Sequence, residues 1–149
     1  MAQAEIIIAD ERLLQEAIDV HNLIVRPKRE VDYFKRRFLG RYNPLALIAR
    51  MDDKPVGFWM GFEHKPGMFY HWLGGVLPEV RRGGIARQLH EAQKAWARDH
   101  GYEFIRCESL NHQREFLHFA IEVGFDIVGI RWDSTQADNQ IMFEMNLVE

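Results

Sequence analysis

The amino-acid sequence predicts a mixed α/β domain, with a central mixed sheet flanked by helices. Short β-branched or aromatic runs alternate with segments whose apolar residues recur at helical spacing. Three of the strand-like runs follow one another across short polar turns, which is typical of an antiparallel meander. One strand–helix–strand unit occupies the middle of the chain, and such a crossover normally pairs its two strands in parallel.

Size and composition favour one globular unit. The 149 residues are 47% hydrophobic and 12% aromatic, values that argue against disorder. A chain of this length can bury a core of its own but is too short for two ordinary domains. We therefore expect a single domain over residues 1–149.

Charge and cysteine content exclude several kinds of function. The net charge of −3 gives no general case for binding nucleic acid or an anionic membrane. Cys107 is the only cysteine and the seven histidines lack zinc-binding spacing, so we expect no disulfide and no metal. No apolar segment approaches the ~18 residues of a membrane span. The N-terminus lacks a signal-peptide pattern, which favours a cytoplasmic location.

The elements of the first part of the chain follow from apolar spacing and helix breakers. Ile6 to Ile8 predict a short strand. Asp10 is placed to cap a helix that ends before Pro27, and a second helix is expected from about Pro27 to Leu39. The outer side of this second helix is basic, with Lys28, Arg29, Lys35, Arg36 and Arg37.

The remaining elements complete the order β-α-α-β-β-β-α-β-α-β-β. The three meander strands are expected over residues 45–51, 56–64 and 69–76. A long helix then places Ile85, Leu89, Ala92 and Trp96 on one face. The last expected elements are a strand over 102–110, a helix over 112–123 ending at Gly124, and strands over 125–132 and 141–147.

The junction between the strand over 69–76 and the long helix carries the strongest chemical signal. A basic, glycine-bearing loop, Arg81-Arg82-Gly83-Gly84, leads into the helix. The first N–H groups of a helix have no intrahelical partner and lie at the positive end of its dipole, so they suit an anion such as phosphate. Neither a Walker loop nor the dinucleotide fingerprint is present. The alternative is a plain strand-to-helix turn with solvated arginines.

The motif Arg81-x-x-Gly84-x-Ala86 resembles the acetyl-CoA loop, R/Q-x-x-G-x-G/A, of the GNAT superfamily of N-acetyltransferases. The order of elements is also that of the family, and Gly101-Tyr102, Asn111 and Gly124-Phe125 fall where members carry a helix-ending glycine, an asparagine and a Gly-Phe pair. The resemblance is best over residues 69–130. It implies a GNAT-like fold and an enzyme that transfers an acetyl group from acetyl-CoA to a primary amine by direct attack in a ternary complex.

The resemblance also implies which residues hold acetyl-CoA. Backbone N–H groups of the loop and first helical turn would surround the pyrophosphate, with arginine side chains adding charge. The preceding strand splays from its neighbour in family members, so its backbone would bond the pantetheine, and the Val76 N–H would donate to the thioester carbonyl. The expected cofactor-binding residues are Gly74, Gly75, Val76, Arg81, Arg82, Gly83, Gly84, Ile85, Ala86, Arg87, Asn111 and Arg114.

Acetyl transfer needs a base, because an aliphatic amine with a pKa near ~10 is protonated at neutral pH. Glu108 is the first candidate, since some members keep a glutamate in this strand; His71 and Glu63 are the next, and each has the alternative of a plain strand residue. The tyrosine that commonly acts as general acid is Ala120 here, so His118, Tyr70 or solvent would replace it. The usual asparagine position of the last helix is Gln113.

Two other functions stay open at this stage. The missing tyrosine is compatible with a non-catalytic acyl-CoA-binding or regulatory module on the same fold. A nucleic-acid-binding domain using residues 26–41 is a third hypothesis, which the net charge of −3 opposes. The basic face of the second helix, with Arg41 after it, is either solvated surface or a wall of the acceptor pocket, and as a wall it would favour an acceptor with a carboxylate or phosphate. A small-molecule or protein amine as acceptor, and a monomer or homodimer, are all compatible with the sequence.

Overall fold

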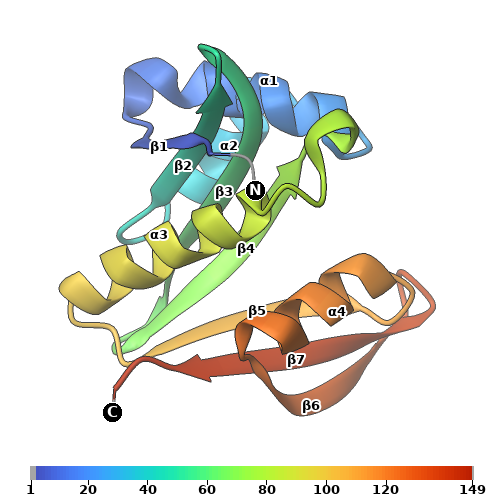
Figure 1. Ribbon diagram of the computed structural model, residues 1–149. Helices are drawn as coiled ribbons and strands as arrows, with labels where there is room; N and C mark the ends of the chain where they lie inside the picture. Colours follow the sequence, from blue (N-terminus) through green and yellow to red (C-terminus); the bar gives the residue numbers. More distant parts are fainter. Residues whose placement is uncertain (1–2, 149) are drawn as a thin grey trace.

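A computed structural model describes residues 3–148 as a seven-stranded sheet with helices on both faces (Figure 1). The strand order is β1-β2-β3-β4-β5-β7-β6. The β4–β5 pair is parallel and all other neighbours are antiparallel, which confirms the predicted mixed sheet. Residues 1, 2 and 149 of the expected domain lie outside the described residues.

The elements follow the predicted order. The strands are β1 (Glu5–Ile8), β2 (Leu45–Met51), β3 (Lys54–Lys65), β4 (Met68–Val76), β5 (Phe104–Leu110), β6 (Asp126–Asp133) and β7 (Asp138–Asn146). The helices are α1 (Leu14–Ile24), α2 (Val31–Phe34), α3 (Ile85–Asp99) and α4 (Arg114–Val123). Short 3-10 turns are η1 (Glu11–Leu13) and η3 (Pro78–Val80), and a π-helical turn, η2 (Lys35–Leu39), extends α2.

The second helix starts later than the sequence predicts, at Val31 instead of near Pro27. The Asn22 amide holds the intervening segment: its Nδ2 donates to the Arg29 carbonyl at 2.9 Å, and its Oδ1 accepts the Arg29 N–H at 2.8 Å. The side chain of Asn22 therefore satisfies both backbone groups of Arg29, including the carbonyl that a helix starting near Pro27 would use to accept an N–H from the next turn. Asp10 caps as predicted, because its carboxylate accepts the Leu13 N–H at 3.1 Å.

Glycines end the long helices where the sequence predicts. Gly101, with φ +84°, follows α3, and Gly124, with φ +110°, follows α4. At the end of α4 the Phe125 N–H donates to the Ala120 carbonyl at 2.9 Å, so the left-handed glycine turns the chain back onto the helix. Both turns bring the next strand back to the sheet.

The sheet separates two apolar clusters. One packs α1, α2 and η2 on the first face, around Phe34, Phe38, Phe58 and Met60. The other packs α3 and α4 on the second face, around Leu89, Ile105 and Phe143. In the part of the chain that the structure describes, no helix is both long and apolar enough to cross a membrane.

Candidate active site

The parallel strands β4 and β5 pair over a short length only. Their register runs from Met68↔Phe104 to Tyr70↔Arg106 and then stops, while β4 stays paired with β3 and β5 with β7. At this point Met60 of β3 faces Leu73 and Gly61 faces His71, so Trp72 is the extra residue of a β-bulge. The two strands diverge beyond the bulge (Figure 1).

The divergence exposes one edge of β4. The Leu77 N–H donates to the Val56 carbonyl at 2.8 Å, so by antiparallel alternation Gly75 points its backbone groups at β3, and Gly74 and Val76 point theirs away from it. Arg81 Nε donates a hydrogen bond to the Val76 carbonyl at 2.9 Å. The backbone of Gly74 and the N–H of Val76 therefore face the open side of the strand.

Gly74 also has a packing reason to be glycine. A Cβ there would come within 2.4 Å of Cε3 of Trp59, the cross-strand partner whose ring covers this position. Trp59 is 4% exposed, and its Nε1 has no hydrogen-bond partner among the described residues. An unsatisfied buried donor beside the open edge of β4 suits a ligand that brings an acceptor.

The loop before α3 makes a tight left-handed turn. Arg82 has φ +68° and Gly84 has φ +84°, and α3 starts at the next residue, Ile85. Such turns direct successive backbone N–H groups into one concavity, and the unpaired N–H groups of the first helical turn add to it. The loop therefore has the backbone geometry on which the predicted anion site depends.

A cavity of about 1150 Å³ lies between this loop, the end of β4 and α4. Its size suits a cofactor rather than a small metabolite. Every predicted cofactor-binding residue lines it except Asn111. Ten further residues that the sequence did not assign to the cofactor also line it: Ile24, Trp59, Pro78, Val80, His112, Gln113, Glu115, Phe116, Phe119 and Glu122. Of these, only Gln113 carried a signal, because it occupies the family's usual asparagine position.

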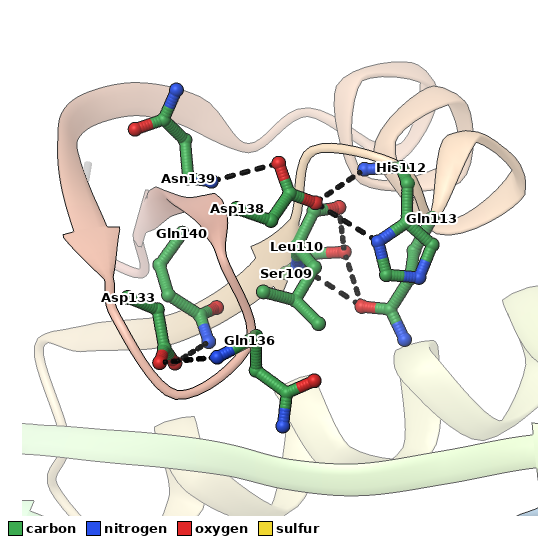
Figure 2. A network of polar contacts seen from close by, with 9 residues as sticks. All are labelled: Ser109, Leu110, His112, Gln113, Asp133, Gln136, Asp138, Asn139 and Gln140. Atoms are coloured by element: carbon green, nitrogen blue, oxygen red, sulfur yellow. Dashed lines mark hydrogen bonds and ion pairs between the residues drawn. The ribbon is translucent and has the colours of Figure 1, made fainter.

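A polar network fixes the loop between β5 and α4 (Figure 2). Residues of this loop line the cavity. Gln113 Oε1 accepts from Ser109 Oγ at 3.1 Å and from the Leu110 N–H at 3.0 Å. Asp138 Oδ2 accepts from the His112 N–H at 3.1 Å and lies 2.9 Å from His112 Nδ1. The Asn111 N–H donates to the Asn139 carbonyl at 2.8 Å. These contacts tie the loop to the β6–β7 hairpin, with Gln113 and not Asn111 at the cavity wall.

A second, smaller cavity of about 350 Å³ lies on the face that α2 and η2 cover. Glu108 and Tyr70 line it, and Tyr70 Oη donates to Glu108 Oε2 at 3.4 Å. Arg131 Nη2 lies 3.5 Å from the same oxygen. Burial, followed by the charge of Glu108, raises the pKa of Tyr70, so its hydroxyl stays protonated and remains a donor.

His71 points to the opposite face of the sheet from Glu108. Its ring stacks on Trp59, with centroids 4.4 Å apart, and its Nδ1 lies 3.1 Å from Gln93 Nε2. Burial, with a smaller contribution from His90, lowers the pKa of His71 to about 3. A neutral imidazole of such low basicity is a poor proton acceptor at neutral pH.

Glu63 lies at the closed end of the β4–β5 pair, opposite Phe69. Its Oε1 accepts a hydrogen bond from Tyr102 Oη at 3.0 Å, and it lines neither cavity. The structure therefore brings only Glu108, of the three predicted bases, into a cavity.

Buried histidines make the stability of the fold depend on pH. Burial lowers the pKa of His71 to about 3 and that of His90 to about 4, against 6.5 in an unfolded chain. The unfolded state therefore binds protons first as the pH falls, so each histidine should reduce the free energy of unfolding by about 1.4 kcal/mol per pH unit between about pH 6 and the folded pKa.

Urea unfolding at several pH values between 5 and 7.5 checks this expectation. The free energy of unfolding should fall towards pH 5, and the fall should be smaller for His90→Asn than for the wild type. An equal dependence of the free energy of unfolding on pH in His90→Asn and the wild type would contradict the lowered pKa of His90. The control is His100→Asn, at an exposed position.

Covalent catalysis by cysteine has no support in the site. Cys107 is 1% exposed, and burial raises the pKa of its thiol. Across residues 3–148, no group of three histidine, cysteine, aspartate or glutamate side chains is arranged to hold a metal ion.

The fold and the site together define an α/β protein with a large cavity between the open edge of β4, α4 and the basic loop before α3. The family model of the acetyltransferase (GNAT) family matches residues 11–125, so the chain belongs to this family.

Solved structures share the whole fold. The ribosomal-protein-S18-alanine N-acetyltransferase from Escherichia coli is 16% identical with a TM-score of 0.83, and the match covers 99% of this chain and 96% of that one. Ard1 from Thermoplasma volcanium is 16% identical with a TM-score of 0.80, over 99% and 100% of the chains. A GNAT family acetyltransferase from Elizabethkingia anophelis, solved with acetyl-CoA bound, is 14% identical with a TM-score of 0.80, over 98% and 99%. No curated protein matches at a significant level.

Proposed function

We propose that this chain is a single-domain, acetyl-CoA-dependent N-acetyltransferase that acetylates a primary amine by direct attack in a ternary complex. One observation carries the proposal: the two cavities flank the same diverging segment of β4. Gly74 to Val76 line the large cavity, whereas Tyr70 and Trp72 line the small one beside Glu108. A thioester at the large cavity and an amine at the small one could therefore meet between β4 and β5.

We assign the large cavity to acetyl-CoA. Membership of the family and the acetyl-CoA bound to the Elizabethkingia neighbour support this assignment. The N–H groups at the start of α3, together with Arg81, Arg82 and Arg87, would hold the pyrophosphate or the ribose phosphate. The Gly74 backbone and the Val76 N–H would hold the pantetheine amides along the open edge of β4.

Strand geometry argues against the Val76 N–H as donor to the thioester carbonyl. Tyr70 pairs with Arg106, so the same register, continued by two residues, would put Glu108 level with Trp72. At about 3.3 Å per residue, Val76 is about 13 Å further along β4. A thioester within reach of a base at Glu108 would therefore lie near the bulge, and we assign the oxyanion donor to the backbone of residues 71–73.

The reaction then needs two proton movements. Glu108 takes one proton from the ammonium, and the free nitrogen then bonds to the acetyl carbonyl carbon as the carbon–sulfur bond breaks; the second proton that the nitrogen loses balances the one that the thiolate gains. The thiolate is an adequate leaving group near neutral pH, because the pKa of a thiol is ~8.5. Tyr70 lines the small cavity and stays protonated, whereas His118 lines neither cavity, so we assign to Tyr70 any proton donation to the thiolate. The inaccessible Cys107 favours direct attack over an acetyl-enzyme.

A two-substrate assay tests the proposed function. The chain is mixed with acetyl-CoA and one member of a panel of amines, and the free CoA thiol is measured with time. We expect thiol release that depends on both the chain and an amine, with acetylated amine found in equal amount by mass spectrometry. Thermal stabilisation by acetyl-CoA without turnover on any amine would instead support the non-catalytic acyl-CoA-binding module.

A further inference from the structure

The small cavity beside Glu108 carries a specificity signal that the proposed reaction does not use. Tyr70 and Glu108 line it from β4 and β5, and Arg37, from η2, and Arg41, which follows η2, also line it. These two arginines belong to the basic segment that the sequence left open between solvated surface and acceptor wall. Arg37 and Arg41 both line the cavity, which favours the acceptor wall over plain solvated surface for these two residues.

Aromatic rings hold both guanidinium groups. The central carbon of Arg41 lies 4.8 Å from the centroid of Phe62, and that of Arg37 lies 5.5 Å from the centroid of Tyr33. Stacking on a ring fixes a guanidinium without neutralising it. The two charges are thus positioned at the cavity by apolar surfaces.

Carboxylates neutralise the other arginines near this cavity but not these two. Arg106 pairs with Glu144 at 2.9 Å, and Arg131 lies 3.5 Å from Glu108. Within residues 3–148 no carboxylate lies within 4.0 Å of Arg37 or Arg41. The small cavity is therefore lined by two arginines without a carboxylate partner among the described residues, as well as by Glu108.

We propose that the acceptor is a small primary amine that also carries a carboxylate or a phosphate group, which Arg37 and Arg41 bind. This inference rests on the proposed function, because it takes Glu108 as the group that faces the amine. Guanidinium groups bind carboxylate and phosphate oxygens in bidentate fashion, so the anion would orient the amine towards Glu108. A polyamine would bring a second cation against the arginines and be disfavoured. The volume of about 350 Å³ favours a small molecule over a polypeptide segment.

Matched amine pairs test the proposal. The pairs are O-phosphoethanolamine with ethanolamine and tyrosine with tyramine, and putrescine is the polycation. A charge-assisted hydrogen bond contributes about 1.5–3 kcal/mol, so kcat/KM should be at least about tenfold higher for the anionic member of a pair. If the ratio of kcat/KM between the anionic and the uncharged member is larger for O-phosphoethanolamine than for tyrosine, phosphate is the preferred group; the reverse indicates carboxylate.

Three variants connect the preference to the arginines. Arg37→Gln and Arg41→Gln should each reduce the preference for the anionic member about tenfold or more, mainly through KM. Arg36→Gln is the matched control, because this residue belongs to η2 and lines neither cavity. All three positions are exposed, so the variants should fold. Stabilisation of the CoA-saturated protein by each amine gives a binding readout that does not depend on turnover.

The outcomes separate this inference from the proposed function. Equal kcat/KM and equal stabilisation within each pair, or Arg41→Gln behaving like Arg36→Gln, would overturn the anionic acceptor and leave the N-acetyltransferase intact. An acidic peptide acetylated far better than either anionic small amine would overturn the small-molecule class. Selective stabilisation by anionic amines, lost in both arginine variants, would support the anion site even if no amine were acetylated, whereas the transferase assignment would then fail.

Discussion

Replacing Gly84 by leucine is expected to abolish the rise in melting temperature that acetyl-CoA causes in the wild type. A ligand at a hundred times its Kd stabilises a protein by about 2.7 kcal/mol, and binding at this loop depends on close approach of backbone N–H groups to phosphate. Gly84 lines the large cavity immediately before α3, so a side chain there would hold the ligand away. Differential scanning fluorimetry with and without acetyl-CoA measures the effect.

Gly101→Leu is the matched control, because Gly101 has the same φ of +84° and follows the other end of α3. Both substitutions force a side chain into the left-handed region and should destabilise the unliganded protein by a similar amount, about 1 kcal/mol. An ideal Cβ on Gly101 meets no atom within 4 Å among the described residues, and Gly101 lines neither cavity. A full acetyl-CoA shift in Gly84→Leu would mean that the loop is not the pyrophosphate site.

The Glu108→Gln substitution is expected to lower kcat by about 100-fold or more, the usual effect of removing a general base. Glutamine keeps the shape of the side chain and the contact with Tyr70 but cannot take a proton from the amine. The acetyl-CoA shift in melting temperature should be unchanged, because Glu108 does not line the large cavity. Steady-state kinetics with a good acceptor amine provide the measurement.

Glu63→Gln is the control for Glu108→Gln. Its carboxylate is bound to Tyr102 and lines neither cavity, so kcat should change little. A large loss of kcat in Glu63→Gln together with normal turnover by Glu108→Gln would reverse the assignment of the base. His71 does not compete for this role, because its pKa of about 3 leaves it a poor base.

Much of the fold was predictable because its signals are local. Strand β2 spans the predicted residues, and Gly124 ends α4 where a left-handed cap is required. The segment before α2 was not predictable, because the amide of Asn22 binds the backbone of Arg29 seven residues later. The residues that predict a helix start do not indicate such a contact.

Most of the residues proposed to hold acetyl-CoA in the large cavity could be predicted from the sequence, whereas the arrangement of the small cavity could not. The loop from Arg81 to Arg87 is contiguous, and its glycines and arginines bind through backbone groups whose geometry depends on few residues. The three candidate bases instead come from three strands, so their faces depend on register, on the bulge at Trp72 and on where the β4–β5 pairing ends. Only the tertiary structure decided that Glu63 lies outside both cavities, that His71 lies on the other face of the sheet, and that Arg37 and Arg41 line one cavity with Glu108, because these relations join segments distant in the chain.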